Sequence, residues 1–129
     1  MIELELQRAV TQFNQREFYD CHDTLEALWI EAIEQDRAFY QGILQIAVAC
    51  YHLGNQNWRG AVILLGEGNR KLQDYQPSYY NLNVTSLRSQ SLYLLKQLQQ
   101  IEPESIGELL VYLNNTDQDS WPKITLLES

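Results

Sequence analysis

Five polar side chains capable of chemistry stand on otherwise apolar segments of the sequence. His22 and Glu26 are four residues apart, so on a helix they lie on one face. On the next apolar segment, Gln45 and His52 fall within about 40° of Gln41 at 100° per residue. An unpaired polar group buried between helices costs about 1–3 kcal/mol, so we expect these side chains to meet one another or a ligand.

A metal site is the first chemistry that this set of side chains predicts. Two imidazoles and a carboxylate are common ligands of zinc and non-haem iron. His22, Glu26 and His52 would then hold a divalent metal such as Zn, with a position left open for water. A metal can bring the pKa of bound water toward neutrality and so support hydrolysis. The pattern lacks the second histidine of the His-Glu-x-x-His motif.

Three other interpretations use the same side chains. Glu26 could act with His22 or His52 as a metal-free acid–base pair, although no nucleophile motif accompanies them. A second interpretation is a buried hydrogen-bond network in which Glu26 and Gln45 orient the imidazoles. The third is a pocket for a small ligand or a peptide. Trp29 continues the row of His22 and Glu26 and joins the same patch.

Helical periodicity runs through most of the chain and predicts an all-α fold. The third segment is apolar in almost every direction, which is typical of a central helix. Forty residues after Asn14 and Phe18 stand Gly54 and Trp58, an echo that favours stacked antiparallel hairpins in an orthogonal or tetratricopeptide-like bundle. The five to six expected helices cover about 2–15, 18–33, 36–53, 56–76, 84–101 and 106–113.

The predicted domain organisation is one helical-hairpin domain at 1–102. A short helix and a C-terminal tail at 103–129 are expected to pack on it. Gly54 is expected to close the third helix in the left-handed conformation. Gly66 and Gly68 indicate close packing or a bend in the fourth. The aromatic residues at helical spacing are expected in the core: Phe18, Tyr19, Trp29, Phe39, Tyr40 and Tyr51.

The charge balance limits the partners. The chain of 129 residues has 9 basic and 17 acidic residues, a net charge of −8. This balance does not suit a nucleic-acid backbone or an anionic membrane surface. Cys21 and Cys50 lie in apolar helical segments, where free cysteines of a reducing cytoplasm are expected. We expect a cytoplasmic protein whose partner is a small molecule or a protein, with homo-oligomers allowed.

Several motifs together resemble the domain of unknown function 309 family. They are Phe13-Asn14-x-x-x-Phe18-Tyr19-x-x-His22-Asp23-x-Leu25-Glu26-x-x-Trp29, Phe39-Tyr40-Gln41-Gly42-Ile43-Leu44-Gln45, Tyr51-His52-x-x-x-Asn57-x-x-Gly60-Ala61 and Leu72-x-x-Tyr75-x-Pro77-x-Tyr79. The likeness covers about residues 3–100 and implies a compact helical fold of bacteria and archaea. Members are often labelled predicted metal-dependent hydrolases, which would give His22, Glu26 and His52 the metal role. The chain departs from the family at Gly66 and Gly68, where better helix formers are usual.

Overall fold

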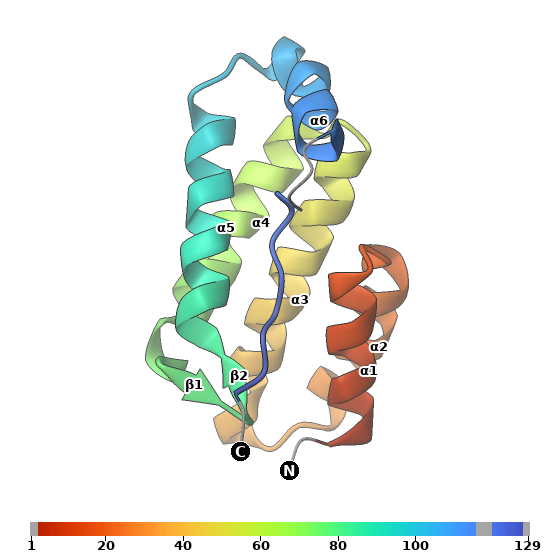
Figure 1. Cartoon of the computed structure of the whole chain (residues 1–129). Helices are drawn as coiled ribbons and strands as arrows, with labels where there is room; N and C mark the ends of the chain where they lie inside the picture. The colour runs from red at the N-terminus through yellow and green to blue at the C-terminus, as the bar shows by residue number, and fades with distance from the viewer. Residues whose placement is uncertain (1–2, 116–119, 128–129) are drawn as a thin grey trace.

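Six α-helices follow one another in a computed structural model that describes residues 3–115 and 120–127 (Figure 1). The predicted all-α fold is confirmed, and the helix ends lie within a few residues of those expected. Ile2, the expected start of the first helix, lies outside the described residues. The helices are α1 (Leu4–Asn14), α2 (Phe18–Glu31), α3 (Glu34–Gly54), α4 (Trp58–Leu72), α5 (Val84–Gln99) and α6 (Ile106–Asn115). Two 3-10 turns (Gln73–Tyr75 and Pro103–Ser105) and the strands β1 (Ser78–Tyr79) and β2 (Leu82–Asn83) connect them.

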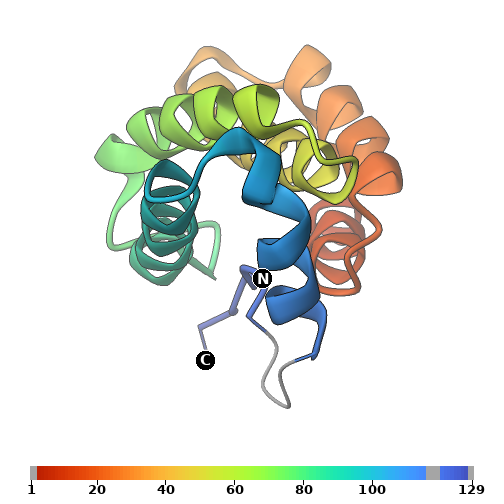
Figure 2. The ribbon, with the colours of Figure 1, turned by 90° about the horizontal axis from the view of Figure 1, so that it is seen from above.

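Helices α1 to α5 pack in sequence, each of the first four against the next one along the chain. Seen from above, these helices form an arc, with α6 and the C-terminal segment on its concave side (Figure 2). The longest helix, α3, lies between α2 and α4 and contributes many buried apolar side chains to the core. Within the described ranges, no helix combines the length and apolarity needed to cross a membrane.

The echo in the sequence reappears in the turns that precede α2 and α4. Arg16 has a φ of 62° and Gln56 a φ of 60°, both in the left-handed region. Each stands two residues before the start of the next helix, at Phe18 and Trp58. The expectation for Gly54 is wrong, because no glycine in the described residues has a positive φ. The left-handed residue of this turn is instead Gln56, two residues after Gly54, and Arg16 has the same place in the first hairpin.

Two glycines let α3 and α4 approach closely. A Cβ added at Gly68 would lie 2.7 Å from the Gly42 carbonyl oxygen and 2.7 Å from Ile46 Cγ1. A Cβ at Gly42 would lie 2.8 Å from Leu72 Cγ. The close packing predicted from the glycines of α4 is therefore confirmed at Gly68. It is wrong at Gly66, where an added Cβ would meet nothing within 4 Å.

A small hairpin occupies the segment between α4 and α5, where no helix was expected. Its two turn residues, Tyr80 and Asn81, have φ values of 46° and 69°, the pattern of a type I′ turn. The buried Asp36 of α3 accepts a hydrogen bond from the Tyr79 hydroxyl at 2.5 Å and another from the Tyr80 hydroxyl. These bonds raise the pKa of both tyrosines to about 12. The hydrogen bond to Asp36 also ties Tyr80 to α3, although the left-handed backbone conformation of Tyr80 is unfavourable for a tyrosine.

The segment 120–127 runs as an extended chain from the end of α6 toward the hairpin (Figure 1). Trp121 and Ile124 are buried in the core. Leu126 forms a β-bridge with Leu82 of β2. This segment therefore closes the concave side of the arc without forming a helix.

Candidate functional site

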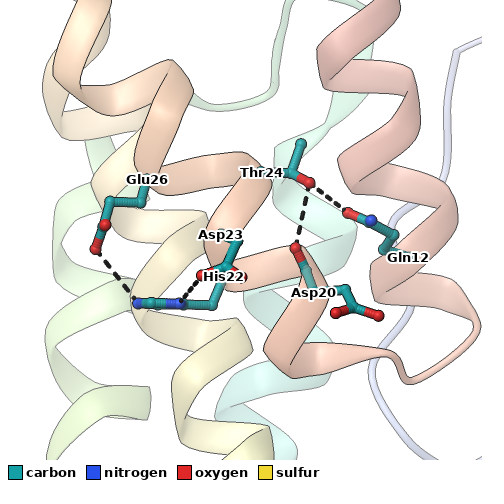
Figure 3. Close-up of polar contacts among 6 residues, drawn as sticks. All are labelled: Gln12, Asp20, His22, Asp23, Thr24 and Glu26. Carbon is teal, nitrogen blue, oxygen red and sulfur yellow. Dashed lines mark hydrogen bonds and ion pairs between the residues drawn. The ribbon is translucent and has the colours of Figure 1, made fainter.

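His22 lies on α2 with both ring nitrogens facing carboxylates of the same helix (Figure 3). Its Nδ1 is 3.2 Å from Asp23 Oδ1, and its Nε2 is 3.5 Å from Glu26 Oε2. The side chains of Asp23 and Glu26 are 63% and 48% exposed. The patch is thus a set of exposed contacts within α2 rather than a buried network, and such exposed contacts add little to stability.

Figure 3 also shows that the other side of α2 faces α1. There the Thr24 hydroxyl donates to Gln12 Oε1 at 2.7 Å, and it lies 3.2 Å from the Asp20 carbonyl oxygen. Thr24 is buried by this contact. Contacts between α1 and α2 therefore leave the face that carries His22 free to border α3.

His52 lies near the end of α3 and is held by the turn that follows. Asn57 Oδ1 accepts the Gly60 N–H at 3.0 Å, which caps α4. The amide nitrogen of Asn57 then faces His52 Nδ1 at 3.2 Å. An amide nitrogen only donates, so Nδ1 accepts, and the proton of the neutral imidazole sits on Nε2. The ring also packs on Gly60, where an added Cβ would lie 2.9 Å from it.

The predicted metal set of His22, Glu26 and His52 is not assembled in the described part of the chain. No group of three His, Cys, Asp or Glu side chains there is arranged to hold a metal ion. Each imidazole is turned toward a partner on its own helix or turn. The Nδ1 lone pair of His52 is taken up by the Asn57 amide, and both nitrogens of His22 face carboxylates of α2, so the two rings are not turned toward a shared ion.

The polar stripe of α3 has the predicted common face but not the predicted network. Gln41, Gln45 and His52 are all half-buried along it. The Gln45 Oε1 atom is buried and has no hydrogen-bond partner in the described ranges, so it does not orient either imidazole. Trp29 is also engaged elsewhere: the Arg37 guanidinium lies 5.0 Å from its ring centroid.

Two tyrosines expected in the core are instead exposed. Tyr19 on α2 is 59% exposed and Tyr51 on α3 is 41% exposed. Their ring centroids lie 5.7 Å apart, so they face each other across the contact between the two helices. The core prediction is confirmed for Phe18, Phe39 and Tyr40, which are buried, and is wrong for this pair.

A small cavity lies beneath these tyrosines and brings the two histidines to one site. Its volume is about 150 Å³, and its surface is almost entirely apolar. We call it the tyrosine–histidine cleft; it is lined by Tyr19, His22, Tyr51 and His52, together with Phe18 and Val48. The sequence did place His22 and His52 on neighbouring helices, and the structure shows that they border the same cavity.

A larger hollow of about 510 Å³ adjoins the cleft and shares Phe18, Tyr19 and Tyr51 with it. Arg16 and Trp121 form part of its wall. The Trp121 ring lies 5.7 Å from that of Phe18, and the Arg16 guanidinium lies 5.9 Å from Trp121. The C-terminal segment thus reaches the edge of the cleft.

Neither cysteine adds a nucleophile to this region. Cys21 and Cys50 are free thiols, and both are buried. Burial raises the pKa of Cys21 to about 12 and also raises the pKa of Cys50. Because the thiolate is the reactive form, both are structural side chains. The expectation of free, core-filling cysteines is confirmed.

Comparison with known proteins matches the segment that carries the cleft. Residues 6–64 match the family described as Domain of unknown function (DUF309). This segment is a DUF309 domain. A stretch of 59 residues is 39% identical to the uncharacterized protein YpuF of Bacillus subtilis (strain 168). That stretch is 45% of this chain and 34% of YpuF. Among solved structures, none matches the chain.

The DUF309 domain contains every residue that lines the cleft. The segment 120–127 lies outside it, and so does the hairpin motif around Tyr79 that completed the resemblance in the sequence. Neither the family description nor the name of the relative states an activity. The hydrolase label implied by the resemblance therefore gains no support from these matches.

Sequence reasoning missed the two tyrosines of the DUF309 domain as site residues. The available signal was their position: Tyr19 stands three residues before His22, and Tyr51 directly precedes His52. On α2 this spacing puts a ring and an imidazole on one face, where their centroids are 6.1 Å apart. Helical spacing gives the direction of a side chain, but it does not tell whether a neighbouring element covers it.

Proposed function

We propose that this chain is a non-enzymatic helical binding module whose ligand site is the tyrosine–histidine cleft. One observation carries the proposal: two exposed tyrosines and two histidines surround a single apolar cavity between α2 and α3. Ligand sites are concave and mostly apolar, with a few polar groups that fix orientation. Contiguous exposed apolar patches mark ligand or partner sites, and the two facing rings form such a patch.

The shape and charge of the cleft point to a small aromatic compound that is neutral or cationic. A cavity of about this volume accommodates one aromatic ring. Asp23 and Glu26 stand beside His22, and Asp20 lines the adjoining hollow. These carboxylates, together with the net charge of −8, disfavour an anion. Tyrosine rings also attract a cation over their faces.

Binding can be measured by NMR with benzylamine as the probe and benzoate as its anionic counterpart. We expect benzylamine to shift the ring signals of His22 and His52 in a saturable way, with benzoate at least tenfold weaker. Val48→Phe fills the cavity and should weaken benzylamine binding at least tenfold. Ile63→Phe adds the same ring on α4, where Ile63 is exposed, and should leave binding unchanged. Unsaturable shifts, or equal binding by both variants, would refute the proposal.

A zinc titration separates this proposal from the metal-dependent hydrolase that the sequence also predicted. We expect no stoichiometric binding of Zn²⁺ by calorimetry, because each imidazole already faces a partner on its own helix or turn. One tightly bound Zn²⁺ per chain, lost in both His22→Ala and His52→Ala, would overturn the binding module in favour of the hydrolase. Glu26→Gln would then test the carboxylate.

A further inference from the structure

Two amide side chains hold the main chain of the C-terminal segment from opposite ends of the arc. On α1, Asn14 Nδ2 donates to the Ile124 carbonyl oxygen at 2.8 Å, and its Oδ1 accepts the Ile124 N–H at 2.8 Å. On α5, Gln90 Oε1 accepts the Lys123 N–H at 2.9 Å, and its Nε2 donates to the Lys123 carbonyl oxygen at 3.2 Å. Asn14 therefore binds both the N–H and the carbonyl oxygen of Ile124, and Gln90 binds both of these groups of Lys123.

The residues that follow extend the hairpin as an added strand. Asn83 N–H donates to the Thr125 carbonyl oxygen at 2.9 Å, and Leu127 N–H donates to the Asn81 carbonyl oxygen at 2.8 Å. The Asn81 side chain donates in turn to the Leu127 carbonyl oxygen at 3.0 Å. Strand addition to a sheet edge is a recurrent way in which proteins bind extended peptides.

Trp121 and Ile124 are the large apolar side chains that anchor this segment, and Pro122 is also buried. Trp121 and Ile124 are 5% and 3% exposed. Trp121 lies against Phe18, and its Nε1 donates to Asn114 Oδ1 at 3.0 Å. Thr125 is exposed, as are the two leucines after it. In strand-addition complexes, main-chain bonds provide affinity and a few pockets provide specificity, which is the division of roles found here.

We propose that the concave side of the arc is a peptide-binding groove and that residues 121–127 are its exchangeable occupant. The partner is a protein with an extended segment that carries an aromatic residue and, three positions later, an aliphatic one. The Asn14 and Gln90 side chains contact only main-chain atoms of the segment, so the groove accepts other sequences with these two anchors. The Asn14 carbonyl oxygen also accepts a hydrogen bond from Lys123 Nζ. The proposal does not rest on the tyrosine–histidine cleft.

The covalent link makes the segment an autoinhibitory strap. A tethered segment has an effective concentration on the order of millimolar, against which a free partner must compete. The strap bridges α1 and α5, whereas each helix of the arc packs on its neighbour in the chain. Successive helix pairs therefore do not depend on the strap for their contacts.

The test uses the full chain and a fluorescent peptide with the sequence of residues 120–127. In the double variant Trp121→Ala/Ile124→Ala, the groove is intact but its own strap lacks both anchors. We expect this variant to bind the peptide at least tenfold more tightly than the unmodified chain. Thr125→Ala is the matched control, because its side chain is exposed and the strap should stay in place.

Two further arms make the peptide experiment specific. Adding Asn14→Ala and Gln90→Ala to the double variant should weaken peptide binding at least tenfold, because the main-chain contacts are lost. A peptide with alanine at both anchor positions should also bind at least tenfold more weakly. Equal binding by the unmodified chain and the double variant, or equal binding with and without Asn14 and Gln90, would overturn the proposal.

Hydrogen exchange on the unmodified chain gives a readout that does not depend on any variant folding. The amides of Lys123, Ile124 and Leu127 are hydrogen-bonded to the groove. If the strap opens alone, they should exchange at least tenfold faster than the core amides of α3. Exchange only at the rate of global unfolding would make the strap a permanent part of the core. A concentration-dependent dimer, lost in Trp121→Ala, would instead assign the groove to a second copy and refute the partner.

Discussion

The tyrosine–histidine cleft and the peptide-binding groove satisfy their polar groups in different ways. In the groove, Asn14 and Gln90 reach a segment about 110 and 33 residues away in the chain, and each makes two main-chain hydrogen bonds to it. In the cleft, His22 pairs with carboxylates of its own helix, and His52 pairs with the turn directly after it. One region depends on long-range contacts and the other on local ones.

This difference separates a site that the chain itself occupies from a site that is open to a ligand. The polar contacts of the groove are made to the chain's own strap, so a partner must displace the strap before it can use them. The Tyr19 and Tyr51 rings of the cleft are exposed, so they are available for a ligand. The regions meet at the contact of Phe18 with Trp121, since Phe18 lines the cleft and Trp121 anchors the strap.

The scaffold shared by both regions can be broken at Gly68, which should give the largest effect. In Gly68→Val the new Cβ would lie 2.7 Å from the Gly42 carbonyl oxygen, so the backbones of α3 and α4 must separate. We expect a loss of about 3 kcal/mol in the free energy of unfolding, measured by urea denaturation. Gly66→Ala is the matched control: its Cβ has open space, and it should gain about 0.5–1 kcal/mol. An unchanged free energy of unfolding in Gly68→Val would mean that α3 and α4 do not pack as closely as the structure shows.

The groove side alone can be weakened at the hairpin that pairs with the strap. Tyr79→Phe removes the hydroxyl that donates to the buried Asp36 at 2.5 Å. We expect a loss of about 1–2 kcal/mol in the free energy of unfolding, since hydrogen bonds to a charged group are worth more than neutral ones. Strap amides should exchange faster, while benzylamine binding in the cleft should not change. An equal effect on both regions would contradict their separation.

The same hydroxyls predict a loss of stability at alkaline pH. The hydrogen bonds to Asp36 raise the pKa of Tyr79 and Tyr80 from 10.0 to about 12 in the folded chain. A raised folded pKa gives stability that is complete below pH 10 and is lost as the pH rises from 10 toward 12. The urea midpoint should fall over this range. In Tyr79→Phe/Tyr80→Phe the fall should be smaller, although the raised pKa of Tyr40 leaves part of it. An unchanged fall would exclude these hydroxyls as its cause.

The helices and their order could be predicted because their signals are local. Apolar residues at helical spacing located α1 to α6, and the forty-residue echo indicated the two hairpins with matching turns at Arg16 and Gln56. The hairpin of β1 and β2 escaped prediction because a type I′ turn usually carries glycine, and here Tyr80 and Asn81 take the left-handed positions. Its stability comes from Asp36, more than forty residues earlier.

The site was predictable in part for the same reason. Helical spacing placed His22 beside Glu26 and placed His52 on the stripe of Gln41 and Gln45. The direction of each imidazole was not predictable, because it depends on the Asn57 cap and on carboxylates that compete for the same ring. The sequence led us to expect that the C-terminal tail packs on the domain, but not where, since no periodic signal joins Asn14 to residues 110 positions later.

The smallest effect on folding stability is expected at the cleft, where it can be compared directly with a matching change in the groove. His22→Ala removes a ring whose partners are exposed, so the free energy of unfolding should change by less than about 0.5 kcal/mol. Gln90→Ala, the corresponding change in the groove, removes two long-range hydrogen bonds and should cost about 1–2 kcal/mol. Urea denaturation at pH 7 measures both. Because His22 borders the cavity, benzylamine binding should weaken in His22→Ala and stay unchanged in Gln90→Ala. If His22→Ala lowers the free energy of unfolding as much as Gln90→Ala does, the imidazole stabilises the fold, and the cleft is not a surface that is free to bind a ligand.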